Sequence, residues 1–292
     1  MRSMLFVPAD SERKLARSLS SPADALILDL EDSIAAERRT VARPMVVDFI
    51  QSARKSGARI PQLWVRINPL DGSDWEADLA GIMRAAPDGL ILPKPHSGED
   101  VHRLSIALGH AETQHGLPSG RTRILPIVTE VPISVLRLET YVGSSSRLMG
   151  MSWGAEDLGA VIGSLANRDE TGAFTSPYRL VRDLCLITAS AAGCEPIDTV
   201  FVNFRDTAGL KAESRASKRD GFTGKIAIHP DQVEPINEVF TPSSEEIAHA
   251  QRVMGAFSVS GTGVASLDGM MLDKPHLKLA ERVLARAKVE PA

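Results

Sequence analysis

Three carboxylates lie within four positions at the end of an apolar stretch near the start of the chain. Asp29 interrupts the apolar residues 26–30, and Glu31 and Asp32 follow directly. Burying an unpaired carboxylate is costly, so we interpret the run as a buried parallel strand whose C-terminal end opens into a polar site. The alternative is an ordinary strand that leads into a helix, with Asp32 or Ser33 as the N-cap.

Two further carboxylates, Glu130 and Asp157, each follow a predicted strand. On consecutive loops of one sheet they would converge, and two oxygen ligands with room for water and substrate oxygens suit Mg²⁺. Without a metal, such a pair would repel and one pKa would rise. The chain has no histidine cluster with metal-ligand spacing and only two cysteines, so zinc is disfavoured. For Asp157 alone, the alternative is a helix cap.

An arginine lies at the end of another predicted strand. The guanidinium of Arg66 can hold a substrate carboxylate or carbonyl through two parallel hydrogen bonds. The alternative is an ion pair with one of the acids after Leu28, and the two roles are compatible. A different donor is the backbone of residues 153–157, where N–H groups before a predicted helix start favour a carboxylate or phosphate.

Basic residues near the loops are weaker candidates. Each of them could contact an anionic cofactor tail, but taken singly each is better explained as a solvated surface charge. His229 is either an acid/base or structural. No G-x-S-x-G, G-x-G-x-x-G or P-loop pattern supports a serine hydrolase, a dinucleotide enzyme or an NTPase. The basic candidates are Arg13, Lys14, Arg17, Lys94 and Lys225.

Hydrophobic periodicity predicts the elements that must position these side chains. Eight short apolar segments are separated by crossovers long enough for helices, which favours parallel strands in βα units. Eight strands close a (β/α)₈ TIM barrel, and polar residues concentrate after the strands, where such barrels have their active sites. The predicted strands are 4–7, 25–29, 63–67, 89–92, 124–128, 147–151, 199–202 and 225–228. Helical spacing is found at 11–19, 74–85, 101–115 and 175–192.

The chain beyond residue 232 is not needed to close a barrel. Helical spacing covers 243–257, a glycine-rich hairpin is predicted within 259–273, and a last helix covers 276–288. We therefore predict a barrel domain over residues 1–232. Residues 233–292 are predicted to form a small helical arm or lid that contributes to the site of a neighbouring subunit.

Composition narrows the class of protein. The 292 residues are 43% hydrophobic and 24% charged, which is typical of soluble globular proteins and sufficient for a large core. The net charge of -4 and the 4% aromatic content argue against nucleic-acid binding. The sequence has no signal-peptide pattern and no apolar run of membrane-spanning length. We therefore expect a cytoplasmic protein without membrane contact.

Seven short segments, each a modest motif alone, are specific in their order and spacing. They are RSMLFVP at 2–8, DALILDLEDS at 24–33, VRIN at 65–68, LPK at 92–94, GAEDL at 154–158, GKIAIHP at 224–230 and DGMMLD at 268–273. Together they resemble the citrate lyase β-subunit-like group of the aldolase/citrate lyase superfamily. That group includes malyl-CoA and citramalyl-CoA lyases and related thioesterases.

The resemblance implies a (β/α)₈ barrel with a C-terminal arm that assembles as a homotrimer or a hexamer. It implies Mg²⁺ on Glu130 and Asp157, and substrate contacts from Glu130 and Arg66. The backbone at Gly154 and Ala155 would hold the carboxylate of a 2-oxo acid.

The resemblance also changes the interpretation of the first acidic run. With direct ligands available elsewhere, Asp29, Glu31 and Asp32 become outer partners of metal-bound water or of Arg66. Asp29 shares a strand face with Ile27 and is expected to point into the barrel.

The implied reaction is Mg²⁺-dependent cleavage of a 3-hydroxy-dicarboxylic acyl-CoA, such as malyl-CoA, citramalyl-CoA or a citryl thioester. The products are acetyl-CoA or a short acyl-CoA and a 2-oxo acid, with Asp273 of a neighbouring subunit as the acid/base. Alternatives are an acyl-CoA thioesterase on the same scaffold, the citryl-carrier-protein lyase subunit of a citrate lyase complex, and a non-catalytic binding subunit. Departures from the family pattern at His96, Val131 and 151–153 leave the acyl group, its stereochemistry and its carrier open.

Overall fold

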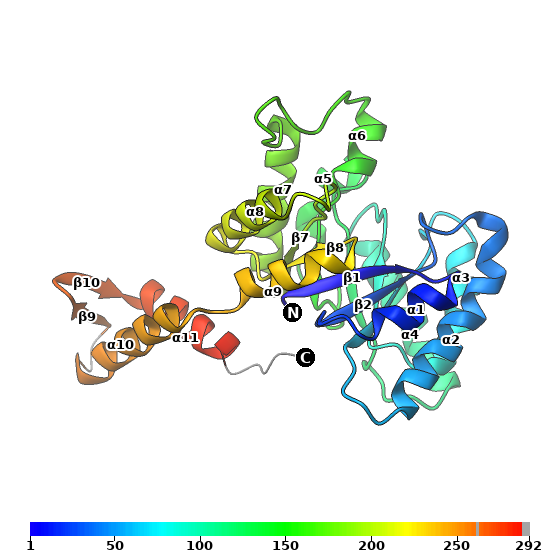
Figure 1. The fold of residues 1–292 in the computed structure, drawn as a ribbon, viewed down its shortest axis with the longest axis horizontal. Helices are drawn as coiled ribbons and strands as arrows, with labels where there is room; N and C mark the ends of the chain where they lie inside the picture. The colour runs from blue at the N-terminus through cyan, green and yellow to red at the C-terminus, as the bar shows by residue number, and fades with distance from the viewer. Residues whose placement is uncertain (261–262, 288–292) are drawn as a thin grey trace.

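Eight parallel strands form a nearly closed barrel (Figure 1). The computed structural model describes residues 1–260 and 263–287. The strands are β1 (Ser3–Pro8), β2 (Ala25–Asp29), β3 (Gln62–Arg66), β4 (Gly89–Leu92), β5 (Arg123–Pro126), β6 (Gly150–Met151), β7 (Glu195–Asp198) and β8 (Gly224–Ala227). Their order is β5-β4-β3-β2-β1-β8-β7-β6. Two isolated parallel bridges, Ile124 with Leu148 and Ile127 with Ser152, join the β5 and β6 segments. The predicted barrel is confirmed.

The seventh strand was predicted in the wrong place, at 199–202. Strand β7 lies before that segment and pairs with β8 through Ile197 and Asp198. The Asp198 carboxylate accepts a hydrogen bond from Lys225 Nζ at 2.7 Å, and both side chains are buried. A pattern that treats charged residues as loop signals misses such a strand. Lys225 is therefore a buried ion-pair partner and does not serve as a rim contact for an anionic cofactor.

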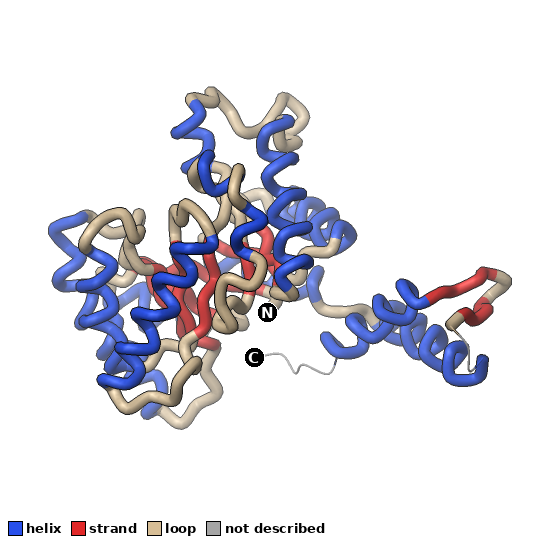
Figure 2. The backbone as a smooth tube through the Cα atoms, turned by 180° about the vertical axis from the view of Figure 1, so that it is seen from behind, coloured by secondary structure: helices blue, strands red, loops and turns tan. Residues whose placement is uncertain are grey.

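Helices surround the strands (Figure 2). They are α1 (Glu12–Ser18), α2 (Arg39–Lys55), α3 (Asp74–Ile82), α4 (Gly98–Gln114), α5 (Pro132–Val135), α6 (Glu156–Ile162), α7 (Ser176–Ala192), α8 (Thr207–Asp220) and α9 (Val233–Phe240). Short 3₁₀ turns are η1 (Ala36–Arg38), η2 (Met83–Ala85), η3 (Leu138–Tyr141) and η4 (Pro230–Gln232). Ser11 and Ser97 accept backbone N–H groups at the starts of α1 and α4. No helix in the described ranges is long and apolar enough to cross a membrane.

The inside of the barrel is filled by apolar side chains. Ile27 and Trp64 lie there on neighbouring strands, together with Met4, Ala25, Ile91, Leu125, Ile127, Ile197 and Ile226. A Cβ atom on Gly89 would lie 2.2 Å from the Trp64 ring. Only glycine therefore allows the indole to occupy the centre of the barrel. Residues that alternate with these, such as Leu26 and Leu28, pack outward against the helices.

Four elements at the end of the chain project from the barrel (Figure 1). They are α10 (Ser244–Ser260), β9 (Val264–Leu267), β10 (Met270–Asp273) and α11 (Lys274–Ala287), and we call them the arm. The strands form an antiparallel hairpin, with Asp268 and Gly269 at positive φ in its turn. The predicted hairpin and last helix include residues 261–262 and 288, which lie outside the described residues.

The arm has a hydrophobic core of its own. Phe257, Ala265 and Leu272 pack there with Ala250, Val253 and Ala280. Helix α9, in contrast, contributes Val233 and Phe240 to the main core of the barrel. The predicted domain boundary after residue 232 stays a proposal. Helix α9 follows that residue but packs with the barrel, so the arm itself begins at α10.

A buried ion pair lies close to the place where the β5 and β6 segments pair. Arg147 donates to both carboxylate oxygens of Glu112 on α4, at 2.7 Å each. The same carboxylate accepts the backbone N–H groups of Gly120 and Thr122. The backbone carbonyl of Arg147 accepts the N–H of Ile124 in β5. Although burial favours the neutral acid, these bonds lower the pKa of Glu112 to about 2.

Replacing Arg147 by Met should lower the free energy of unfolding by about 3 kcal/mol at pH 7, because a buried carboxylate loses its cation. The pKa of Glu112 is lowered in the folded state, so the loss should be full above pH 4.5 and shrink as the pH falls toward 2. Denaturant unfolding measures it. The control Arg252→Met removes an exposed pair with Asp268 and should cost less than about 1 kcal/mol. Equal losses in both variants would contradict the role of the buried pair.

Candidate active site

A cavity of about 430 Å³ opens at the C-terminal ends of the strands, and we call it the mouth cavity. Its apolar wall includes Phe6 of β1, Trp153 after β6 and Ile226 of β8. Its polar lining comprises Asp29, Asp32, Ser33, Arg66, Glu130, Glu156, Asp157 and Thr199. The barrel thus brings together carboxylates and an arginine that are far apart in the sequence.

Glu130 is a buried carboxylate of the mouth cavity. It follows β5, and 3% of its surface is exposed. Its Oε2 accepts the backbone N–H of Lys94 at 2.6 Å. Burial and the nearby charge of Asp157 raise the pKa of Glu130 to about 8. The two carboxylates therefore repel in the way that the sequence predicted for a pair without a cation.

Gly154 allows the backbone after β6 to approach Glu130. A Cβ atom at position 154 would lie 2.7 Å from Glu130 Cγ, closer than side chains tolerate. The N–H of Gly154 is held by Thr129 Oγ1 at 3.1 Å. Ala155 is the N-cap residue of α6, and Asp157 lies in the first turn of that helix. The loop therefore places a backbone turn and the second carboxylate beside Glu130.

Arg66 is held by the acidic run that follows β2. Its Nε and Nη2 donate to the two oxygens of Asp29 at 2.6 and 2.7 Å. Its Nη1 lies 2.9 Å from Glu31 Oε2, in the geometry of an ion pair without an aligned hydrogen bond. The guanidinium also covers the ring of Phe6. Burial alone would raise the pKa of Asp29, but the bonds and charge of Arg66 hold it below its ordinary value.

Lys94 joins the two halves of the acidic cluster. Its Nζ donates to Glu31, lies 3.0 Å from Asp32 Oδ2 and lies 3.3 Å from Asp157 Oδ1. Its backbone is in the left-handed region, at a φ of 49°, which is strained for a residue with a side chain. That turn aims the N–H at Glu130 and the ammonium at the other carboxylates. Burial raises the pKa of Glu31 to about 7 in spite of both cations.

The carboxylates at the mouth outnumber the cations that contact them. Five acids face two basic groups, which leaves a formal surplus of three negative charges when all are ionised. Within the described ranges no group of three or more His, Cys, Asp or Glu side chains forms a complete metal site. Two carboxylates with uncompensated charge can supply part of the shell of a divalent cation, with water or substrate as the remaining ligands. The acids are Asp29, Glu31, Asp32, Glu130 and Asp157, and the cations are Arg66 and Lys94.

The remaining sequence candidates lie elsewhere or have another role. Asp273 ends β10 in the arm and is exposed, away from the residues that line the mouth cavity. His229 stacks on the ring of Phe204 and accepts the N–H of Asp231, which supports its structural alternative. Asp32 contacts Lys94 and does not cap η1, whose N-cap is Ala35.

The contacts of Lys94 with the acidic cluster were not predicted from the sequence, where this lysine was interpreted as a solvated surface charge. Its position two residues beyond β4 was the available signal, shared with the acids after the other strands. What the pattern lacked was the direction of the side chain, which depends on the unusual φ of this residue.

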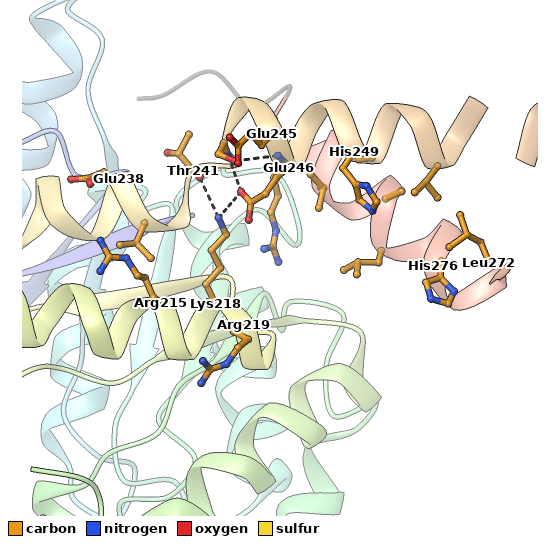
Figure 3. Close-up of a pocket in the computed structure, with 18 residues that line it drawn as sticks. Arg215, Lys218, Arg219, Glu238, Thr241, Glu245, Glu246, His249, Leu272 and His276 are labelled. Carbon is orange, nitrogen blue, oxygen red and sulfur yellow. Dashed lines mark hydrogen bonds and ion pairs between the residues drawn. The ribbon is translucent and has the colours of Figure 1, made fainter. Parts of the chain in front are cut away.

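A larger cavity, of about 790 Å³, lies between the barrel and the arm (Figure 3). Lys218 of α8 crosses one side of it and donates to Glu246 of α10 at 2.8 Å. His276 of α11 lies at its far end, away from this ion pair. This cavity shares no lining residue with the mouth cavity. The clustered carboxylates and Arg66 line the mouth cavity, so we place the chemistry there.

The fold and the site define a class of protein, a (β/α)₈ barrel with a cluster of carboxylates at the C-terminal ends of its strands. Within that class the chain belongs to the HpcH/HpaI aldolase/citrate lyase family, which matches residues 2–230.

Known relatives match nearly the whole chain. It is 34% identical to citrate lyase subunit beta of Escherichia coli, over 99% of this chain and 93% of the relative. It is 32% identical to (3S)-malyl-CoA thioesterase of Cereibacter sphaeroides, over 98% and 94%. The crystal structure of CitE from Mycobacterium tuberculosis, in complex with magnesium, acetoacetate and coenzyme A, superposes with a TM-score of 0.78 at 30% identity, over 99% of this chain and 98% of that one.

The repulsion at Glu130 gives a test in the metal-free protein. A raised carboxyl pKa means that wild type loses stability as the pH rises from 4.5 to about 8. The glutamine in Glu130→Gln does not ionise. The free energy of unfolding of the variant minus that of wild type should therefore increase over that pH range and stay constant above it. Chemical unfolding in EDTA between pH 5 and 9 measures the difference. Glu12→Gln, at an exposed glutamate of α1, is the control. A difference for Glu130→Gln that stays constant with pH would rule out the repulsion.

Proposed function

We propose that this protein is a Mg²⁺-dependent carbon–carbon lyase that cleaves a 3-hydroxy-dicarboxylic acyl-CoA into a short acyl-CoA and a 2-oxo acid. The observation that carries the proposal is the surplus of carboxylates around Glu130 and Asp157, placed opposite Arg66 in one mouth cavity. Relatives named citrate lyase subunit beta, and a homologous structure complexed with magnesium and coenzyme A, support it.

Glu130 and Asp157 are the proposed metal ligands. Their mutual repulsion and the raised pKa of Glu130 are the features that a divalent cation relieves. When bound there, Mg²⁺ supplies Lewis-acid polarisation of the hydroxyl and carboxylate oxygens of the substrate.

Arg66 and the loop after β6 position the substrate. The double hydrogen bond to Asp29 fixes the guanidinium plane, so the charge of Arg66 stays aimed at the cavity as negative charge develops on the substrate. The backbone at Gly154 and Ala155 is the proposed contact of the 2-oxo acid carboxylate, and the N–H of Gly154 would exchange its bond to Thr129 Oγ1 for the substrate. Glu130 is also a proposed substrate contact, and Trp153 contributes to the apolar wall of the cavity, which limits the access of water to a bound substrate.

The arm supplies the acid/base, Asp273, to the mouth of a neighbouring subunit in a homotrimer or hexamer. Asp273 ends a projecting hairpin and is exposed, as a residue that meets a second subunit must be in the single chain. Met270 and Met271 beside it are exposed apolar residues that a subunit contact would cover. Asp273 then protonates the enolate carbon after the bond is broken.

Two other reactions have specific support. The (3S)-malyl-CoA thioesterase relative supports hydrolysis of the thioester, in which CoA and the intact hydroxy acid leave. The citrate lyase relatives support a citryl thioester on a carrier protein as the substrate. Both reactions use the same mouth cavity, so products distinguish them.

Incubation with malyl-CoA, citramalyl-CoA and citryl-CoA should release a 2-oxo acid without free thiol from at least one substrate. Oxo acid and thiol are measured separately, with Mg²⁺ and with EDTA. EDTA should abolish turnover, and excess Mg²⁺ should restore it. Thiol release without oxo acid identifies the thioesterase and overturns the lyase. Full activity in EDTA overturns the metal assignment.

Mixing two inactive variants tests whether the site is shared between subunits. Asp273→Asn should lower kcat by about 10²–10⁴-fold with Mg²⁺ affinity unchanged, and Glu130→Gln should lose metal-dependent activity with its arm intact. Glu130→Gln is preferable to Arg66→Ala, which would leave the buried Asp29 carboxylate unpaired. Refolded equal mixtures should recover about a quarter of wild-type activity if sites form between neighbours in a closed ring. No recovery in verified mixed oligomers contradicts a shared site.

A further inference from the structure

Asp273 is in contact with a histidine of its own arm. His276 Nδ1 lies 2.6 Å from Asp273 Oδ1 and 3.2 Å from the backbone N of the same residue. The two side chains come from adjoining elements, the end of β10 and the first turn of α11. Both are about half exposed in the single chain.

The arrangement has an ordinary structural explanation that must be separated from any chemical one. Asp273 directly precedes α11, and a side chain at the third helical position that accepts the N–H of the N-cap residue is one half of a capping box. His276 occupies that third position, since α11 begins at Lys274. Glutamine serves the same capping purpose but cannot exchange a proton at neutral pH.

The short contact is a hydrogen bond whose direction depends on the tautomer of the ring. With a hydrogen on Nδ1, the ring donates to the Asp273 carboxylate. With the hydrogen on Nε2, Nδ1 is an acceptor for the backbone N–H or for a hydrogen on the carboxyl oxygen. Either form places the imidazole where it can pass a proton to the carboxyl group.

We propose that His276 is a positioning residue that fixes the carboxyl group of Asp273 and passes a proton to it. This inference rests on the proposed function, in which Asp273 protonates the enolate carbon. A free carboxyl group is mostly ionised at neutral pH and holds no proton to give. A proton passed from the ring corrects that mismatch, and the second contact of the ring, with the backbone, fixes the direction of the transfer.

The proton count of the step balances. The Asp273 O–H bond breaks, a C–H bond forms at the enolate carbon, and Asp273 is left as a carboxylate facing the ring. The substrate hydroxyl has released its own proton to water, and the pair regains one proton from water through the imidazole. No oxidant, reductant or further co-reactant is needed.

Other charged groups share a cavity with the ring. His276 lines the cavity between barrel and arm (Figure 3), and Glu246 there is already engaged by Lys218. Lys274 adjoins the pair in sequence. The further charged or titratable groups along that cavity are Glu245 and His249 on α10, Arg215 and Arg219 on α8, Glu238 on α9 and Arg286 on α11.

The test compares His276→Gln and His276→Ala with Asp273→Asn in the full-length protein. The readouts are kcat and KM for the substrate found active above, the pH profile of kcat, and exchange of the acetyl-CoA α-protons in D₂O. His276→Gln should keep the thermal stability and KM of wild type, lower kcat and exchange by about tenfold or more, and lose one ionisation from the pH profile. Histidine side-chain ¹⁵N spectra add a readout free of activity, because Asp273→Asn should shift the Nδ1 resonance of His276.

The outcomes separate the proposals. If Gln behaves as wild type, or rescues what Ala loses, His276 is a helix cap only and the inference is overturned. An unmoved Nδ1 resonance in Asp273→Asn overturns it as well. If Asp273→Asn itself remains active, the acid/base assignment of the proposed function is wrong.

Discussion

Charge compensation at the barrel mouth is the constraint on which the rest of the structure depends. Arg66 and Lys94 are shared among four carboxylates, which come from the loops after β2 and β6. Asp29 orients the guanidinium from one side, and Glu31 connects it to the ammonium of Lys94. Glu130 forms no ion pair with either cation, and burial and the charge of Asp157 raise its pKa. The proposed metal site is the place where compensation is incomplete.

Backbone geometry serves the same arrangement. Glycine at 154 removes the Cβ that would collide with Glu130, and the left-handed turn at Lys94 delivers an N–H to that carboxylate. Inside the barrel, Trp64 opposite Gly89 fills the centre beneath the polar layer. The site therefore rests on a rigid apolar floor, which limits how far the carboxylates can move apart to relieve their repulsion.

Local patterns predicted most of the fold and part of the site. Alternating apolar residues located the strands, and the same alternation placed Asp29 toward the barrel interior, where it meets Arg66. The failures have physical causes. Strand β7 was missed because its Asp198 is neutralised by Lys225, a partner distant in sequence. The place of Lys94 depends on one dihedral angle that composition does not encode. The partner of Asp273 became visible only where a strand meets a helix.

The separate core of the arm has a consequence for how the molecule opens. Apolar contacts of Phe257, Ala265 and Leu272 stay within the arm, while the barrel keeps its own core. We expect two such cores to open as two cooperative units, with amide hydrogens in each exchanging through different opening events. An arm that moves would therefore not have to break apolar contacts of the barrel core, so its motion and the integrity of the ion-paired strands are energetically separate.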